Sequence, residues 1–195
     1  SEASCPDQAA APIPQADVRD YSKEKPVSDD IFKAYQGLFA YDKTELDPVI
    51  ESSDESSPFW IKEKITYNAA YGSERILAYL FLPKETQPPY QTVVVFPGAE
   101  ALSSRPSENF RESYYDFMVK SGRAVLCPIY KSTFDRYDGY IISTATANSW
   151  RNQMIFWYKD LACSIDYLET RGEIDKDKIA FYGVSMGAHV GVVLI

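Results

Sequence analysis

The spacing of hydrophobic and polar residues along the chain predicts a series of strands and helices. Residues 61–67 alternate between polar and apolar side chains, and residues 75–82 form a second strand-like run, with Gly72 at a turn between them. These two runs predict an antiparallel pair. Three later apolar runs are also predicted strands: residues 92–96, 124–130 and 178–183. The run at 92–96 is continuous and β-branched, as expected for a strand covered on both faces.

Two stretches between these runs have helical spacing. One extends from about residue 108 to residue 120 and ends at Ser121-Gly122. The other extends from Trp150 to about Thr170 and ends at Arg171-Gly172, with apolar residues on one face. Because helices alternate with apolar strands, we expect a mostly parallel sheet with right-handed crossovers and helices on both faces.

The N-terminal part differs in composition from the rest. Residues 1–27 are rich in Ala, Pro, Asp and Gln, and we interpret them as a linker or disordered segment. Residues 59–195 are the predicted main domain. Residues 28–58 are expected to form a short helix that docks on it, followed by a polar, turn-rich connection at 51–58. Ser28 or Asp29 caps this predicted helix, and its apolar face consists of Ile31, Phe32, Tyr35, Leu38 and Phe39.

Composition and charge exclude several classes of function. The 195 residues, 45% of them hydrophobic and 14% aromatic, are enough for one sizeable core. The net charge of -8 argues against binding to nucleic acid or anionic lipid, and no apolar run approaches the roughly 20 residues of a membrane-spanning helix. We predict no cofactor and no metal, because Cys5, Cys127 and Cys163 are too scattered for a zinc site or a disulfide framework. Cys127 and Cys163 are predicted to be small buried residues, and the compartment, cytoplasmic or extracytoplasmic, stays open.

The clearest chemical signal is the pentapeptide Gly183-Val184-Ser185-Met186-Gly187. A serine hydroxyl is a weak nucleophile, so it needs a turn that presents it to a base and to oxyanion donors. A predicted apolar strand ends at the pentapeptide and an apolar helix begins after it, which is the context of a nucleophile elbow. Glycines two positions either side of Ser185 permit the tight turn. The alternative is a coincidental glycine-rich turn.

Two backbone N–H groups are candidates for an oxyanion hole. One belongs to Met186, which follows the nucleophile at a helix N-terminus. The second is expected from the turn after residues 92–96, where Pro97-Gly98 precedes Ala99, the first choice, and Glu100, the next. An ordinary turn at Pro97-Gly98 is the alternative.

The printed chain lacks a complete catalytic triad. In a site built on a nucleophile elbow, the catalytic acid and histidine follow the serine in the sequence. Only ten residues follow Ser185, and none of them is acidic. The one histidine, His189, lies one helical turn past Ser185, and we interpret it as a helix-face residue. We therefore expect the chain to be truncated before its acid and its histidine.

A long irregular connection between residues 130 and 150 is rich in aromatic side chains. Loops of this length often build binding sites. Tyr130, Tyr137 and Trp150 are therefore candidate substrate contacts, and Phe134 and Tyr140 are candidate pocket walls. The alternative is that these rings stack into the core.

Several blocks of sequence carry a family resemblance: Tyr71-Gly72-Ser73-Glu74-Arg75, Val95-Phe96-Pro97-Gly98, Pro128-Ile129-Tyr130-Lys131 and Phe181-Tyr182-Gly183-Val184-Ser185-Met186-Gly187-Ala188. From residue 59 to the end the chain resembles dienelactone-hydrolase-like and prolyl-oligopeptidase-like α/β-hydrolases. More narrowly, it is similar to hydrolase domains that follow the kinase domain in some bacterial serine/threonine kinases. The resemblance implies a bacterial protein with a three-layer α/β-hydrolase fold, of which this chain is the N-terminal part. It also implies a covalently linked kinase domain upstream.

The resemblance also implies a function. It points to hydrolysis of a small-molecule carboxylic ester or related acyl compound, with Ser185 as nucleophile and with the acid and histidine beyond Ile195. Pro97 stands where many relatives have histidine, although a backbone N–H donor does not depend on that side chain. The chain itself has no glycine-rich phosphate loop, His-Arg-Asp motif or Asp-Phe-Gly motif of a kinase. The alternative function is a non-catalytic binding or regulatory module that uses the aromatic loop.

Overall fold

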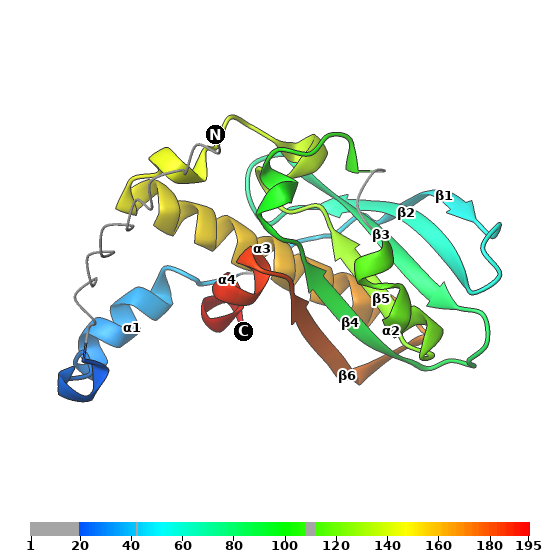
Figure 1. Cartoon of the computed structure of the whole chain (residues 1–195), viewed down its shortest axis with the longest axis horizontal. Coiled ribbons are helices and arrows are strands. Elements are labelled where there is room, and N and C mark those ends of the chain that lie inside the picture. Colours follow the sequence, from blue (N-terminus) through cyan, green and yellow to red (C-terminus); the bar gives the residue numbers. More distant parts are fainter. Residues whose placement is uncertain (1–19, 42, 108–111) are drawn as a thin grey trace, which may run out of the picture.

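Six strands form one sheet in the computed structural model, which describes residues 20–41, 43–107 and 112–195. The strands are β1 (Val49–Asp54), β2 (Trp60–Asn68), β3 (Arg75–Pro83), β4 (Tyr90–Phe96), β5 (Ala124–Pro128) and β6 (Ile174–Gly183). Their order across the sheet is β1-β2-β3-β5-β4-β6 (Figure 1). Residues 1–19, with most of the predicted linker and Cys5, lie outside the described residues.

The sheet combines an antiparallel part with a parallel part. β2 and β3 pair antiparallel over their whole length, from Trp60 opposite Pro83 to Asn68 opposite Arg75, which confirms the predicted pair. β3 is antiparallel to β5, whereas β4 is parallel to both β5 and β6. The α/β class is therefore confirmed, and the parallel part of the described sheet consists of β5, β4 and β6.

β1 corrects the prediction that residues 51–58 form only a polar connection. Every residue of β1 is exposed, and the strand pairs antiparallel with β2 at the edge of the sheet. A strand with solvent on both faces has no alternation of apolar and polar residues, so periodicity cannot reveal it. Its last four residues, 51–54, are polar and suit a sheet edge, where a wholly apolar strand would invite aggregation.

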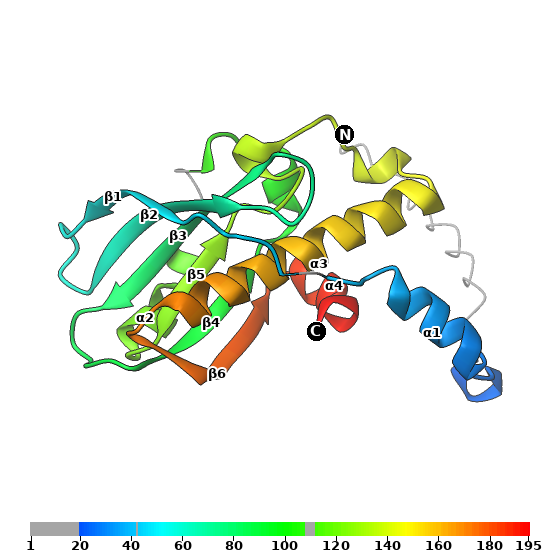
Figure 2. The same cartoon turned by 180° about the vertical axis from the view of Figure 1, so that it is seen from behind.

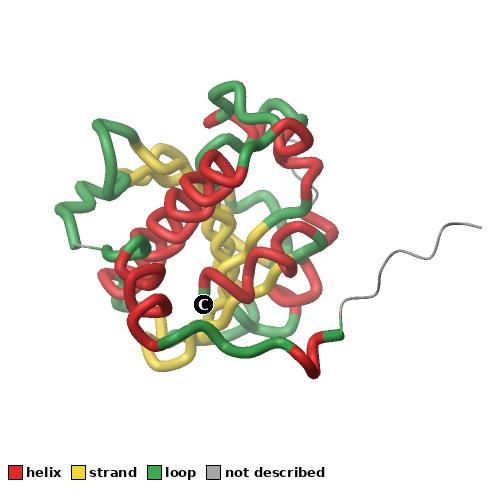
Figure 3. The backbone as a smooth tube through the Cα atoms, turned by 90° about the vertical axis from the view of Figure 1, so that its left-hand side faces the viewer, coloured by secondary structure: helices red, strands yellow, loops and turns green. Residues whose placement is uncertain are grey.

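Helices cover both faces of the sheet (Figure 1 and Figure 2). α3 (Ala147–Thr170) and α4 (Met186–Leu194) pack on one face and the short α2 (Asp116–Lys120) packs on the other. In the side view of Figure 3 the strands lie between helical segments. Within the described residues, no helix is both long and apolar enough to cross a membrane.

The helix boundaries differ from the predicted ones for local reasons. α3 begins three residues before Trp150 because Thr146 caps it, its hydroxyl oxygen accepting a hydrogen bond from Ser149 N–H (3.2 Å). The predicted helix 108–120 is confirmed only as α2, preceded by the 3₁₀ turn η4 (Glu112–Tyr114). Its first residues, 108–111, lie outside the described residues.

β4 shows how one strand serves two hydrophobic cores. Val94 and Phe96 belong to the core under α3 and α4, and Val93 and Val95 belong to the core under α2. Successive side chains of a strand point to opposite faces, so a strand covered on both sides is apolar throughout. This arrangement explains the continuous apolar run in the sequence.

The two described cysteines are buried, one in each core. Cys127 packs on the α2 side and Cys163 on the α3 side, and both are free thiols. This burial confirms the prediction. It also raises the pKa of both thiols, which keeps them in the unreactive protonated form.

The N-terminal helix α1 (Asp29–Gly37) does not pack on the main domain as predicted. The Ser28 hydroxyl oxygen accepts a hydrogen bond from Ile31 N–H (3.4 Å), so the predicted cap is confirmed. The apolar side chains of the helix, however, are 41% to 62% exposed: Ile31, Phe32, Tyr35 and Leu38. Figure 2 shows α1 projecting away from the sheet, so these four residues of the predicted apolar face do not dock on the main domain.

The segment after α1 makes the contact with the main domain instead. The ring of Phe39 meets the ring of Tyr158 edge-on, with 5.7 Å between centroids. The Tyr41 hydroxyl donates to Asp166 Oδ2 (2.7 Å), and Lys43 Nζ lies 2.6 Å from Asp166 Oδ1. These residues fasten the segment across α3.

A buried ion pair joins α3 to the loop after β5. Arg136 Nη1 donates to Asp160 Oδ2 (2.7 Å), and Asp160 is fully buried. The Tyr71 hydroxyl donates to Asp160 Oδ1 and Lys131 N–H donates to Oδ2, each at 2.7 Å. Burial raises the pKa of the Asp160 carboxyl, and its three donors oppose that shift. Burial alone would lower the pKa of the Arg136 guanidinium, but the interactions with Asp160 and Tyr71 together raise it above its usual value.

Replacing Asp160 with alanine would remove the buried counter-charge of the Arg136 guanidinium and leave Glu74, whose Oε2 lies 3.2 Å from Arg136 Nη2, as an ion-pair partner. Removing the partner of a buried charge costs about 3–5 kcal/mol when no other partner remains, so we expect Asp160→Ala to lower the free energy of unfolding by up to that amount. Urea denaturation followed by tryptophan fluorescence measures the loss. Lys43→Ala, which removes a 69% exposed side chain that pairs with Asp166 and Glu169, is the control and should change the midpoint much less. Equal shifts in the two variants would contradict a special role for the buried pair.

Candidate active site

Ser185 lies at the sharp turn between β6, which ends at Gly183, and α4, which begins at Met186. Its backbone has φ 48° and ψ -106°, a conformation that a residue other than glycine rarely adopts. Strain of this kind persists only where the surrounding structure enforces it, and it clusters at functional sites. The side chain of Ser185 is exposed, whereas Met186 and Gly187 are buried. The turn therefore presents the serine at the surface, as a nucleophile elbow requires.

Close contacts require both glycines of the turn. A Cβ on Gly187 would lie closer than 3.0 Å to the carbonyl oxygen and carbon of Phe96. A Cβ on Gly183 would meet the backbone of Gly187 and Ala188 at similarly short range. Backbone atoms cannot move aside by a side-chain rotation, so these contacts confirm the predicted reason for glycine at both positions.

The parallel pairing of β4 with β6 brings the second predicted loop to the nucleophile. Phe96 is opposite Gly183 in the register, and Val184 N–H donates to the Phe96 carbonyl (3.0 Å). The two chains therefore leave the sheet side by side at its carboxyl edge, which is where open α/β sheets place their sites. Pro97-Gly98 and the 3₁₀ turn η2 (Ala99–Leu102) follow β4 at this edge (Figure 1).

Two backbone N–H groups at this edge have no acceptor within their own helices. Met186 is the first residue of α4 and Ala99 is the first residue of η2, and the first residues of a helix have no preceding carbonyl to bond. The N–H of Met186 also lies at the positive end of the α4 dipole. Ala99 is exposed. These are the two donors that the sequence names for an oxyanion hole.

The Ser185 hydroxyl has no hydrogen-bond partner in the described part of the chain. His189, the one histidine of the sequence, is exposed on α4, and its backbone N–H donates to the Ser185 carbonyl (3.1 Å). This is the helix-face position that the sequence predicts. Among the described residues, no cluster of three or more His, Cys, Asp or Glu side chains is arranged to hold a metal ion.

The aromatic loop is less exposed than its sequence suggests. Tyr130 is fully buried and stacks on Phe96 at 4.1 Å between centroids, so it packs in the core and is not a surface contact for a substrate. Trp150 is partly buried, edge-on to Trp157 at 5.9 Å. Tyr137 is 41% exposed and is the one of the three candidate substrate contacts that stays well exposed.

The structure reveals a set of buried polar side chains that sequence reasoning missed: Ser107, Ser132, Thr133, Gln153, Asp160 and Ser164. The sequence carries a signal for Asp160, which falls between Trp157 and Leu161 on the apolar face of the predicted helix. It carries none for the contact of Ser107 with Asp135, because the two residues lie on different loops.

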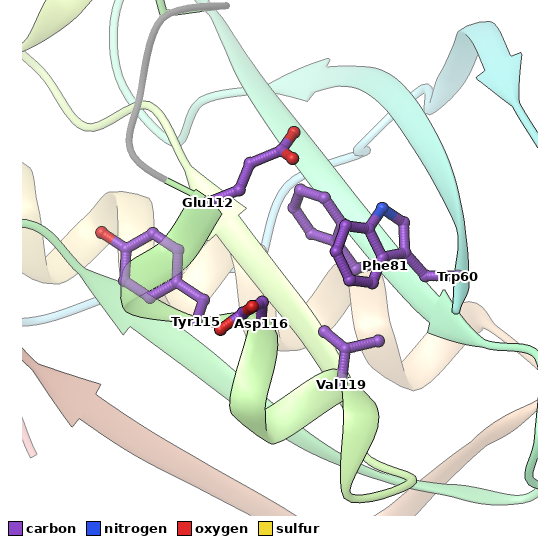
Figure 4. Close-up of a pocket in the computed structure, with 6 residues that line it drawn as sticks. All are labelled: Trp60, Phe81, Glu112, Tyr115, Asp116 and Val119. Carbon is purple, nitrogen blue, oxygen red and sulfur yellow. The ribbon is translucent and has the colours of Figure 1, made fainter. Parts of the chain in front are cut away.

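The structure also contains a small apolar pocket (Figure 4). It is lined by Trp60, Phe81, Glu112, Tyr115, Asp116 and Val119, between α2 and the strands β2 and β3. Phe81 is opposite Val125, near the start of β5, whereas Ser185 lies beyond the carboxyl ends of β4 and β6. The pocket is thus near the other end of the parallel strands and is not part of the candidate active site.

Residues 76–195 match the model of the dienelactone hydrolase family. The chain belongs to this family. Its mixed sheet, with helices on both faces and the serine turn after β6, is of the α/β-hydrolase type that the resemblance implies. No curated protein matches the chain in sequence.

Solved structures share the fold at low sequence identity. A Bacteroides fragilis protein described as a candidate acetyl xylan esterase has a TM-score of 0.65 and 14% identity, over 85% of this chain and 48% of that chain. Acetyl xylan esterase 1 from Thermoanaerobacterium has a TM-score of 0.64 and 15% identity, over 87% of this chain and 55% of that chain. The glucuronoyl esterase from Solibacter usitatus has a TM-score of 0.55 and 12% identity, over 84% of this chain and 55% of that chain. The chain thus spans about half the length of these structures.

We expect Gly187→Ala to destabilise the protein and to displace the turn that carries Ser185. The added methyl group would overlap the Phe96 carbonyl, and overpacking of this kind costs about 1–3 kcal/mol. Thermal unfolding followed by circular dichroism measures the loss. Gly172→Ala is the matched control, because no atom lies within 4 Å of the added Cβ, and its Tm should be unchanged or slightly higher. If both variants keep the wild-type Tm, the close contact does not constrain the turn.

Proposed function

We propose that the protein containing this chain is a serine hydrolase that cleaves carboxylic esters or related acyl compounds through an acyl-enzyme on Ser185. The observation that carries the proposal is an exposed, strained Ser185 at the turn between β6 and α4, with the N–H groups of Met186 and Ala99 at the first positions of α4 and η2, where neither has an acceptor within its own helix. Membership of the dienelactone hydrolase family supports it. The similar folds of proteins described as acetyl xylan and glucuronoyl esterases favour an ester as the substrate.

In the proposed reaction, Ser185 Oγ attacks the ester carbonyl while a general base takes the hydroxyl proton. The carbonyl oxygen becomes an oxyanion and accepts hydrogen bonds from the N–H groups of Met186 and Ala99. The alcohol then leaves with the proton that the base returns. Water attacks the acyl group on Ser185 and releases the acid. The base and its carboxylate partner are assigned to a part of the protein outside the described residues.

A second candidate function is a non-catalytic binding or regulatory module. The observation that favours it is the Ser185 hydroxyl, which has no hydrogen-bond partner within the described ranges. In such a module Tyr137, exposed on the loop after β5, would contact the ligand.

In the intact protein, Ser185→Ala should abolish both hydrolysis of small aryl esters and covalent labelling by a fluorophosphonate probe. Loss of the nucleophile in a serine hydrolase lowers kcat by about 10⁶-fold. Ser52→Ala, on the exposed edge strand β1, is the matched control and should keep both activities. An intact protein that neither hydrolyses esters nor reacts with the probe would favour the binding module.

The 195-residue chain by itself should turn over aryl esters at least about 10⁴-fold more slowly than the intact protein, because oxyanion donors without a base retain only residual catalysis. Steady-state assays at equal concentrations of the two proteins test this, with the Ser185→Ala chain as background. Robust hydrolysis by the chain alone would contradict the assignment of the base to another segment.

A further inference from the structure

The loop that follows β4, residues 97–107, carries the proposed oxyanion donor Ala99, and we call it the oxyanion loop. It begins after Phe96, which is fixed by the pairing of β4 with β6. It ends at Ser107, which is 1% exposed and whose N–H donates to Asp135 Oδ2 (3.0 Å). The Ser107 hydroxyl donates to the same carboxylate oxygen. The oxyanion loop is therefore held at both ends, and Asp135 holds the end that no strand fixes.

Asp135 is the strongest acceptor at this end of the loop. The Ser107 hydroxyl also lies 3.2 Å from the Tyr79 hydroxyl on β3. Hydrogen bonds to an ionised group are about twice as strong as those between neutral groups, and the carboxylate takes two donors from one residue. A second contact joins the same two loops, since the Arg105 guanidinium lies 4.1 Å over the Tyr137 ring.

Asp135 is itself held by the loop after β5. It lies in the 3₁₀ turn η5 (Phe134–Arg136), next to Arg136. The Arg136 guanidinium pairs with Asp160 of α3 and also donates to the Ile129 carbonyl (2.9 Å). Phe134 has φ 43°, a left-handed conformation that is rare outside glycine. Such a conformation persists only where surrounding contacts enforce it, and the Arg136 bonds supply them.

We propose that Asp135 is a positioning residue for the oxyanion hole, transmitting the fixed position of α3, through Asp160 and Arg136, to the loop that carries Ala99. The catalytic part of this proposal rests on the proposed serine hydrolase function. Oxyanion donors act because they are fixed before the charge develops, and a misplacement of about 1 Å can cost about 10²-fold in rate.

Hydrogen exchange of the 195-residue chain tests the anchoring without requiring activity. The N–H groups of Ala101, Ser103 and Ser104 are hydrogen-bonded within the oxyanion loop. We expect Asp135→Ala to speed their exchange by at least about tenfold, because the loop then opens without global unfolding. Because the two donors of the buried Ser107 lose their acceptor, the urea midpoint should fall slightly, and the amides of α3 should remain slower to exchange than those of the oxyanion loop. Unchanged exchange of the three amides would overturn the proposal.

Two further variants separate the anchoring contact from a general effect of substitution. Asp135→Asn keeps an acceptor oxygen for Ser107 and should restore most of the protection. Asp116→Ala removes a carboxylate that pairs with Lys120 on α2, and it should not change exchange in the oxyanion loop. Faster exchange in the Asp116→Ala chain would overturn the assignment of the effect to Asp135.

Kinetics of the intact protein give the second readout. Asp135→Ala should lower kcat for a small aryl ester by about 10- to 100-fold with KM within about twofold, because the donors act on the transition state. Asp135→Asn should recover most of kcat. Faster exchange with unchanged kcat in an active enzyme would overturn the catalytic part of the proposal. If the wild-type protein hydrolyses no ester, the proposed function fails, and the exchange experiment still decides whether Asp135 anchors the loop.

Discussion

The close approach of α4 to the end of β4 is the constraint on which the site depends. Gly187 lies against the Phe96 carbonyl with no room for a Cβ, and Val184 N–H donates to the same carbonyl. The chain must therefore reverse between strand and helix within two residues, and Ser185 takes a positive φ to do so. The exposure of its hydroxyl and the place of the Met186 N–H beside it both follow from this contact.

β4 is the strand through which the fold builds the site. It pairs in parallel with β5 on one side and β6 on the other, so three chain segments leave the sheet at one edge. Loops that are distant in the sequence become neighbours there. Ser107 and Asp135, 28 residues apart, are hydrogen-bonded because each follows one of these strands.

The loop after β5 shows why a buried charge is tolerated close to a candidate active site. Asp160 and Arg136 are both buried, yet each has several hydrogen-bond partners, so neither charge is left unsatisfied. A buried pair adds little net stability when its desolvation is counted, but breaking it is costly. The pair therefore ties the loop after β5, which contains the strained Phe134, to α3.

The sequence by itself determined the features that depend on one element and its immediate neighbours in the chain. The spacing of apolar residues predicted β2, β3, β4 and α3, and the glycines around Ser185 predicted the turn, because both patterns report on local geometry. The tertiary structure alone decided that β1 pairs at the sheet edge, that Tyr130 is buried under Phe96, and that the face of α1 stays exposed. It also decided that Asp135 reaches Ser107. Each of these outcomes depends on which surfaces contact one another. Strand register and helix packing determine those contacts, and both are set only in the assembled sheet.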